Sequence, residues 1–169
     1  MTNSTQTNDF LDFNEGGKPA LPSALNVLTI LTFIGCAVEV LGSVWRFFTA
    51  EKSYKQLQEA QGKMENAPAW AKGMMSPEML EVSRKAMENK LILLVITLAG
   101  TALCLWGAME MRKLKKQGYL LWVVGEFLPI LGGVIIVGTG MLSGFSMFVL
   151  VFPIIFLILY TVNKKHLLY

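Results

Sequence analysis

Side chains that carry out chemistry are scarce in this sequence. It has one histidine, His166, and two cysteines, Cys36 and Cys104, which lie inside apolar runs and form no CxxC motif. A zinc cluster, a haem held by two histidines and a disulfide framework each need more of these residues or other spacings. We therefore expect no resident metal or cofactor, and we expect both cysteines to be small buried apolar residues.

Charge is also scarce and nearly balanced. Only 16% of the residues are charged and the formal net charge is +3. The chain lacks the basic and aromatic face or the zinc spacing that binds nucleic acid, so no nucleic-acid partner is expected. No nucleophile–base pair or glycine-rich phosphate loop is present, and the sequence indicates no enzyme. Residues 1–20 lack the basic and apolar regions of a signal peptide and predict a flexible polar tail.

Apolar sequence, in contrast, is abundant and gathered in four blocks. Hydrophobic residues make up 53% of the chain, and each block approaches the roughly 20 residues that a helix needs to cross a bilayer. Only helices suit such blocks, because lipid offers no hydrogen-bond partner to a bare backbone. The sequence predicts an all-α membrane protein with one domain at 21–169. Its four transmembrane helices are expected at about 21–48, 91–111, 119–141 and 145–162.

The forty or so polar residues between the first two spans predict a helical hairpin outside the membrane, at about 49–90. Its first arm extends the first span, with Glu51 and Lys55 spaced for an i,i+4 ion pair. Ser76 as N-cap and Pro77 as first helical residue begin the second arm, which we expect to run into the second span without a break.

Methionines gather in this hairpin, near its expected tip at Trp70: Met64, Met74, Met75, Met79 and Met87. Thioethers suit Cu(I), which leaves a soft-metal site open. The preferred interpretation is an apolar surface that touches a partner or the membrane, because no cysteine or histidine accompanies the methionines.

A basic turn between the second and third spans sets the predicted orientation. It contains four basic residues in five positions: Arg112, Lys113, Lys115 and Lys116. Lysine and arginine favour the cytoplasmic side of a membrane. The two predicted sides carry nearly equal numbers of them, and the density of this turn decides between the sides. We predict an inner (plasma) membrane protein with both termini in the cytoplasm.

Three carboxylates fall within or near the spans, where a charge costs about 2.5–3.5 kcal/mol at the centre. Glu110 lies close to the basic turn and is expected to pair with it. Glu39 shares a small, polar helix face with Gly35, Gly42 and Arg46, a face that we expect to contact protein. Arg46 is two turns from Glu39, too far for an ideal contact within one helix.

The third carboxylate, Glu126, lies in the unusual stretch GEFLPILGG. Pro129 is expected to kink the helix and to free the carbonyl of Gly125 beside Glu126. Glycines share a face with Pro129, which predicts close helix packing: Gly118, Gly125, Gly132, Gly133 and Gly140. Two interpretations stay open, a proton, water or cation site at Glu126 or a kinked packing seam. The three carboxylates are expected to be spread through the membrane.

The segment Met111–Ile130, MRKLKKQGYLLWVVGEFLPI, resembles a pattern in small, uncharacterised four-span bacterial inner-membrane proteins. In these, a basic KLKKxG turn leads into aromatic residues and a GE or GQ pair. The resemblance implies a four-span inner-membrane fold and carries no activity with it.

Two functions follow as hypotheses. The first is a membrane protein that acts by association, as a homo-oligomer or an accessory subunit of a larger envelope complex. Its partners are the bilayer and other membrane proteins or further copies of itself. The alternative is a small proton- or cation-coupled transporter or channel that uses Glu39 and Glu126. An enzymatic or lipid-modifying role has no residues that we can name.

Overall fold

The computed structural model describes residues 21–62, 77–142 and 150–167, and every regular element in these ranges is a helix. The elements are α1 (Ser23–Gly62), α3 (Pro77–Glu88), α4 (Lys90–Arg112), α5 (Lys116–Val137), η2 (Thr139–Leu142), α7 (Val151–Asn163) and η3 (Lys164–His166). The expected all-α fold is confirmed for these residues. The tail at 1–20 and the expected tip at Trp70 lie outside them.

Three of these helices are long and apolar enough to cross a membrane, namely α1, α4 and α5. The second predicted span, 91–111, matches α4 to within one residue at either end. The described part of the fourth predicted span is α7, whose 13 residues are fewer than a bilayer crossing needs. Residues 145–149 of that prediction lie outside the described ranges.

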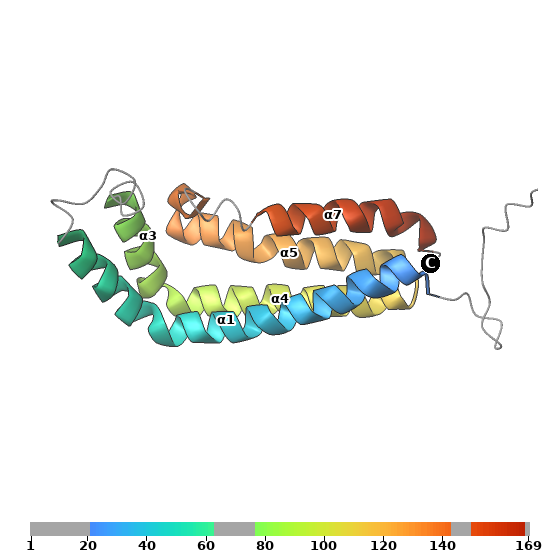
Figure 1. The fold of residues 1–169 in the computed structure, drawn as a ribbon, viewed down its shortest axis with the longest axis horizontal. Coiled ribbons are helices and arrows are strands. Elements are labelled where there is room, and N and C mark those ends of the chain that lie inside the picture. The colour runs from blue at the N-terminus through green and yellow to red at the C-terminus, as the bar shows by residue number, and fades with distance from the viewer. Residues whose placement is uncertain (1–20, 63–76, 143–149, 168–169) are drawn as a thin grey trace, which may run out of the picture.

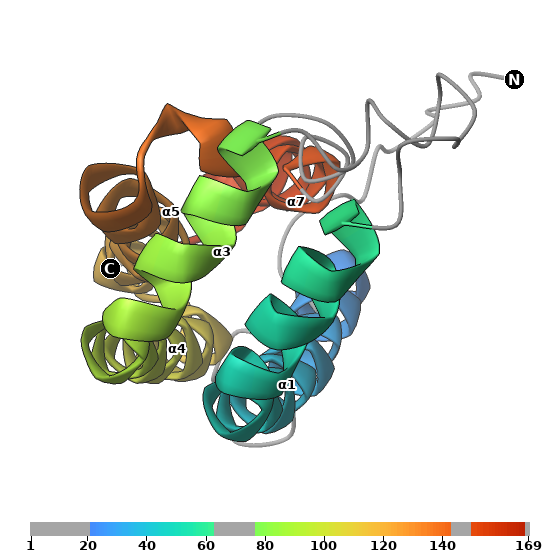
Figure 2. The same cartoon turned by 90° about the vertical axis from the view of Figure 1, so that its left-hand side faces the viewer.

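The helices form a bundle with two different ends. Figure 1 shows α1, α4, α5 and α7 lying along the long axis, with α3 at one end, and Figure 2 views the bundle from that α3 end. The other end, called here the turn end, gathers the start of α1, the turn between α4 and α5, and the end of α7. The largest fully buried side chains lie on the segments that meet there: Trp122, Tyr160, Leu25, Met111 and Thr29.

At the α3 end, two expectations about the hairpin arms are wrong. The second arm does not run into the second span, because Asn89 interrupts the helix and α3 meets α4 at a steep angle (Figure 1). The carbonyl of Lys85 accepts from the Asn89 side chain at 2.9 Å and from the Asn89 backbone N–H at 3.0 Å. Glu51 pairs with Lys90 at 2.6 Å rather than with Lys55, which ties the start of α4 to α1.

The third span was predicted to reach residue 141, but α5 ends at Val137. Gly138 has φ +103°, a backbone conformation that residues other than glycine rarely adopt. It turns the chain out of the helix. Gly140 therefore belongs to η2 and not to the glycine face of α5. A Cβ at Gly140 would lie 2.8 Å from Val82 Cγ2, so this glycine sits against α3 instead.

Two pairs of glycines bring α4 and α5 into backbone contact. A Cβ at Gly100 would lie 2.7 Å from the carbonyl oxygen of Gly125, and a Cβ at Gly125 would lie 2.6 Å from that of Gly100. The pair Gly107 and Gly118 repeats this geometry at 2.7 Å and 2.6 Å. No side chain fits at such distances, so each glycine is required by the approach of its partner.

Pro129 belongs to the same contact. A Cβ at Gly100 would lie 2.6 Å from Pro129 Cγ, so the ring packs into the space that this glycine leaves open. The carbonyl of Gly125, which loses a donor to Pro129, therefore faces Gly100. The helix continues through Pro129 to Val137.

Substituting these glycines should give opposite results at contacted and uncontacted positions. Gly107→Ala places a Cβ 2.5 Å from the backbone nitrogen of Trp122, which cannot move aside. We expect it to lower the free energy of unfolding by about 1–3 kcal/mol. In the monomer, Gly42→Ala meets nothing within 4 Å and should raise that free energy by about 0.5–1 kcal/mol, because alanine favours the helix. Thermal unfolding in detergent measures both, and equal effects would contradict the backbone contact.

Candidate functional site

The main cavity of the described structure is an open groove of ≈ 940 Å³, called here the central groove. Helices α1, α3, α4, α5 and α7 all contribute to its wall, which is mostly apolar. Its volume falls within the roughly 300–1,000 Å³ of small-molecule sites. The groove reaches from Tyr54 and Met87 at the α3 end to Thr32 and Trp122 towards the turn end.

A small polar and aromatic cluster closes the groove towards the turn end. The hydroxyls of Thr32 on α1 and Tyr160 on α7 are 2.7 Å apart and buried. The rings of Trp122 and Tyr160 pack with centroids 4.7 Å apart, and each residue is only 1% exposed. These contacts join α1, α5 and α7 where the groove ends.

Glu126 projects from α5 into the wall of this groove and is partly buried. Its carboxylate contacts the thiol of Cys104, with Oε2 3.6 Å from Sγ. The same thiol lies 3.6 Å from the carbonyl oxygen of Trp122. Among the described residues, no lysine, arginine or histidine forms an ion pair with Glu126. Both cysteines of the chain are free thiols and buried, as expected.

Glu39 has a partner that the sequence analysis excluded. Arg46 Nη2 lies 2.7 Å from Glu39 Oε1, although seven residues separate the two along α1. That separation is a rise of about 10 Å, which two long side chains extended towards each other can span. The pair is open to its surroundings, with 47% of the Glu39 side chain and 67% of the Arg46 side chain exposed.

The expected spread of the three carboxylates is wrong for two of them, because Glu39 and Glu126 line the same groove. Contacts between helices show why. Cys36 Sγ lies 4.0 Å from the carbonyl of Thr101, and Cys104, one turn later on α4, contacts Glu126. Glu126 follows Gly125, which packs on Gly100 beside Thr101, and Glu39 is one turn from Cys36 on α1. The two carboxylates therefore lie within about a turn or two of each other along the bundle.

The small, polar face of α1 is only half covered. Thr32, Cys36 and Ser43 are buried, as expected for a face that contacts protein. A Cβ at Gly35 or Gly42 would meet no atom of the described chain within 4 Å. The packing expected at these two glycines is therefore absent from the described single chain, because the neighbouring helices lie on the Cys36 side of α1.

Glu110 lies apart from the groove, in the last turn of α4. Its side chain is 12% exposed and pairs with Lys113 at 2.9 Å and Lys115 at 2.7 Å. Arg112 donates to Thr29 Oγ1 at 3.3 Å and so ties this turn to α1. The predicted pairing of Glu110 with its basic neighbours is thus present, and Lys116 begins α5. The dense basic turn is partly neutralised by its own carboxylate.

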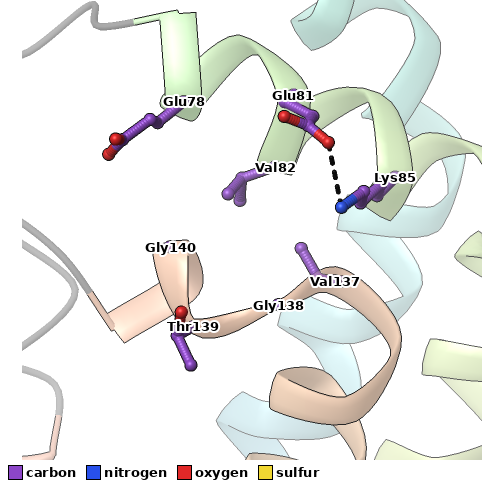
Figure 3. Close-up of a pocket in the computed structure, with 8 residues that line it drawn as sticks. All are labelled: Glu78, Glu81, Val82, Lys85, Val137, Gly138, Thr139 and Gly140. Carbon is purple, nitrogen blue, oxygen red and sulfur yellow. Dashed lines mark ion pairs between the residues drawn. The ribbon is translucent and has the colours of Figure 1, made fainter.

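A second hollow of ≈ 400 Å³ lies at the α3 end, between α3 and the turn from α5 into η2 (Figure 3). Val82 projects from α3 towards Val137 and Gly140, and Glu81 pairs with Lys85 at 3.0 Å. The hydrogen bond and charge of Lys85 lower the pKa of Glu81, so this carboxylate is held ionised by its own neighbour. The hollow therefore presents no unpaired charge at Glu81.

Metal-binding geometry is absent from the part of the chain that the structure describes, since no three histidine, cysteine or acidic side chains gather there. Of the five hairpin methionines, Met64, Met74 and Met75 lie outside that part. Comparison of the chain with protein-family models, with curated proteins and with solved structures finds no match. The resemblance at Met111–Ile130 therefore stays a prediction.

Several residues of the site escaped the sequence analysis. Gly100 and Gly107 were overlooked, although they stand seven apart, as do Gly118 and Gly125 on the next span. That shared spacing was an available signal of close helix pairing. No sequence signal indicates Tyr160, because its bond to Thr32 joins residues 128 positions apart.

The contact between Thr32 and Tyr160 can be measured with a double-mutant cycle. Thr32→Val and Tyr160→Phe each remove one hydroxyl and keep the shape of the side chain. We expect a coupling energy of about 0.6–1.7 kcal/mol, the range measured for hydrogen bonds between membrane helices. Unfolding of the two single variants and the double variant in detergent gives the value. Additive effects would show that the hydroxyls do not interact.

Proposed function

We propose that this chain is a multi-pass membrane protein that acts by association, as a homo-oligomer or as an accessory subunit of a larger envelope complex. The observation that carries the proposal is the uncovered face of α1, where Gly35 and Gly42 meet no neighbour and the Glu39–Arg46 ion pair stays open. This face lies on a helix that is long and apolar enough to cross a membrane.

Contact of this face of α1 with lipid would be energetically unfavourable. A charged side chain within the hydrocarbon is expensive even when it is paired, and glycine leaves a furrow that lipid chains fill badly. A helix of another subunit would cover the ion pair and pack closely at both glycines. The same chain already uses close glycine packing between α4 and α5.

The proposed arrangement in the membrane has four spans, at about 21–48, 91–111, 119–137 and 145–162, in a cell inner membrane. The last part of α1 and all of α3 form the extramembrane hairpin, and both termini are cytoplasmic. Support comes from the basic turn on the opposite side of the bundle from α3 and from the ion pair of Lys90 with Glu51 at the base of the hairpin.

Association through α1 predicts that bulk on its glycine face separates the subunits. Native mass spectrometry of the protein extracted in mild detergent should show an oligomer or a complex with other subunits. Gly35→Leu or Gly42→Leu should shift the protein to the monomer, because leucine fills the space that a partner helix needs.

The matched control is Gly62→Leu, since Gly62 also meets nothing within 4 Å but lies at the end of α1, away from this face. It should leave the assembly intact. A wild-type monomer, or an oligomer that tolerates both leucines, would rule out association through α1.

A second candidate function is favoured by the shared position of Glu39 and Glu126. Two carboxylates on one groove are the arrangement that a proton- or cation-coupled transporter or channel requires, because ionisable groups inside a membrane mark ion pathways. Glu126 is the better candidate of the two, since Glu39 already holds Arg46.

This candidate predicts that Glu126→Gln abolishes proton or cation flux in liposomes, while the protein still assembles. Glu39→Gln should reduce the flux as well, because it frees Arg46 within the groove. Glu88→Gln is the control, since Glu88 pairs with Arg84 on α3 and does not line the groove. Wild-type flux in assembled Glu39→Gln and Glu126→Gln proteins would exclude the transport role.

A further inference from the structure

We propose that the central groove binds an amphipathic organic molecule that carries a single positive charge, with Glu126 as its counter-ion. Gly35, Glu39 and Arg46 of the face proposed for association also line this groove, so a ligand at Glu126 and a partner helix at Gly35 would share part of it. The inference also gives the second candidate function a ligand class.

The charges that line the groove leave one group without a partner. Arg46 holds Glu39 at 2.7 Å, and Lys90 holds Glu51 at 2.6 Å. Glu126 also lines the groove, and its only polar contact in the described chain is the thiol of Cys104. Of the four charged side chains that line the groove, Glu126 is therefore the one without an ion-pair partner among the described residues.

An uncompensated carboxylate among apolar side chains is unstable, so it takes up a proton or a cation. Calcium needs six to eight oxygen ligands and magnesium a near-octahedral set. The described residues bring no three acidic, histidine or cysteine side chains together. A cationic group with an organic body needs no such ligand set, because a single carboxylate balances its charge.

The wall of the groove fits the body of such a molecule. Most of it is apolar, and aromatic side chains enter it from three helices, including Phe47, Trp122 and Phe156. Aromatic rings favour organic cations near their faces. The volume of ≈ 940 Å³ is enough for a drug-sized ligand.

The route into the site runs from the α3 end. The Thr32–Tyr160 hydrogen bond and the packing of Tyr160 on Trp122 close the groove towards the turn end. Towards the α3 end, the groove continues along Thr49, Ser53 and Tyr54 of α1. These hydroxyls give a charged group polar contacts on its way to Glu126.

Binding is tested with octyltrimethylammonium and its neutral counterpart 1-octanol, added below micellar concentration to the purified full chain in nonionic maltoside detergent. Isothermal titration calorimetry should show the cationic probe binding at least tenfold more tightly than the alcohol. Glu126→Gln should weaken the cationic probe at least tenfold and leave the alcohol unchanged. Glu88→Gln, outside the groove, should bind both probes as the wild type does.

A second measurement uses the wild-type fold alone. Because a ligand that binds only the folded protein stabilises it, the cation should raise the thermal unfolding midpoint of the wild type, while 1-octanol at the same concentration should raise it less. Equal affinity of the wild type for both probes, or an unchanged unfolding midpoint at saturating cation, would overturn the proposal even if Glu126→Gln fails to fold. If the cation binds but no flux is measured in liposomes, the binding site is supported and only the transport role is ruled out.

Discussion

The backbone contact between α4 and α5 is the constraint on which the rest of this structure depends. At Gly100 with Gly125 and at Gly107 with Gly118, each helix lies where a side chain of the other would have to be. Lipid gives no hydrophobic driving force for helix association, so such close packing is what holds two apolar helices together. Once α5 is fixed on α4, the position of Glu126 follows, one residue beyond a glycine that must face Gly100.

In the resulting bundle, some polar side chains have hydrogen-bond or ion-pair partners and others do not. Glu110 has two lysines in its own turn, and the hydroxyls of Thr32 and Tyr160 satisfy each other. Glu126 has a thiol, which is a weak donor. The open Glu39–Arg46 pair needs a covering neighbour, and the unpaired Glu126 needs a counter-charge. Association would cover the open ion pair, and ligand binding would supply the counter-charge of Glu126.

The all-helical fold and the three apolar helices were predictable from the sequence, because block length and hydropathy are local properties. Local chemistry also indicated the pairing of Glu110 with its basic neighbours. The shared level of Glu39 and Glu126 was not predictable, since it depends on how α1 and α5 are shifted along α4, which contacts such as Cys36 with Thr101 reveal. The interruption at Asn89 was not predictable either, because the residues on both sides favour a helix and the steep angle between α3 and α4 is a tertiary arrangement.

The seven-residue spacing of the contacting glycines has a geometrical consequence. Gly100 and Gly107 repeat on α4 as Gly118 and Gly125 repeat on α5, and Gly132 continues the second series against Ile96. A straight α-helix drifts by about 20° for every seven residues, so contacts that recur at this interval require the two helices to coil around each other with a left hand. Because these contacts join backbone to backbone, neither helix can slide along or rotate against the other without a clash. The left-handed crossing of α4 and α5 is therefore fixed by the glycines.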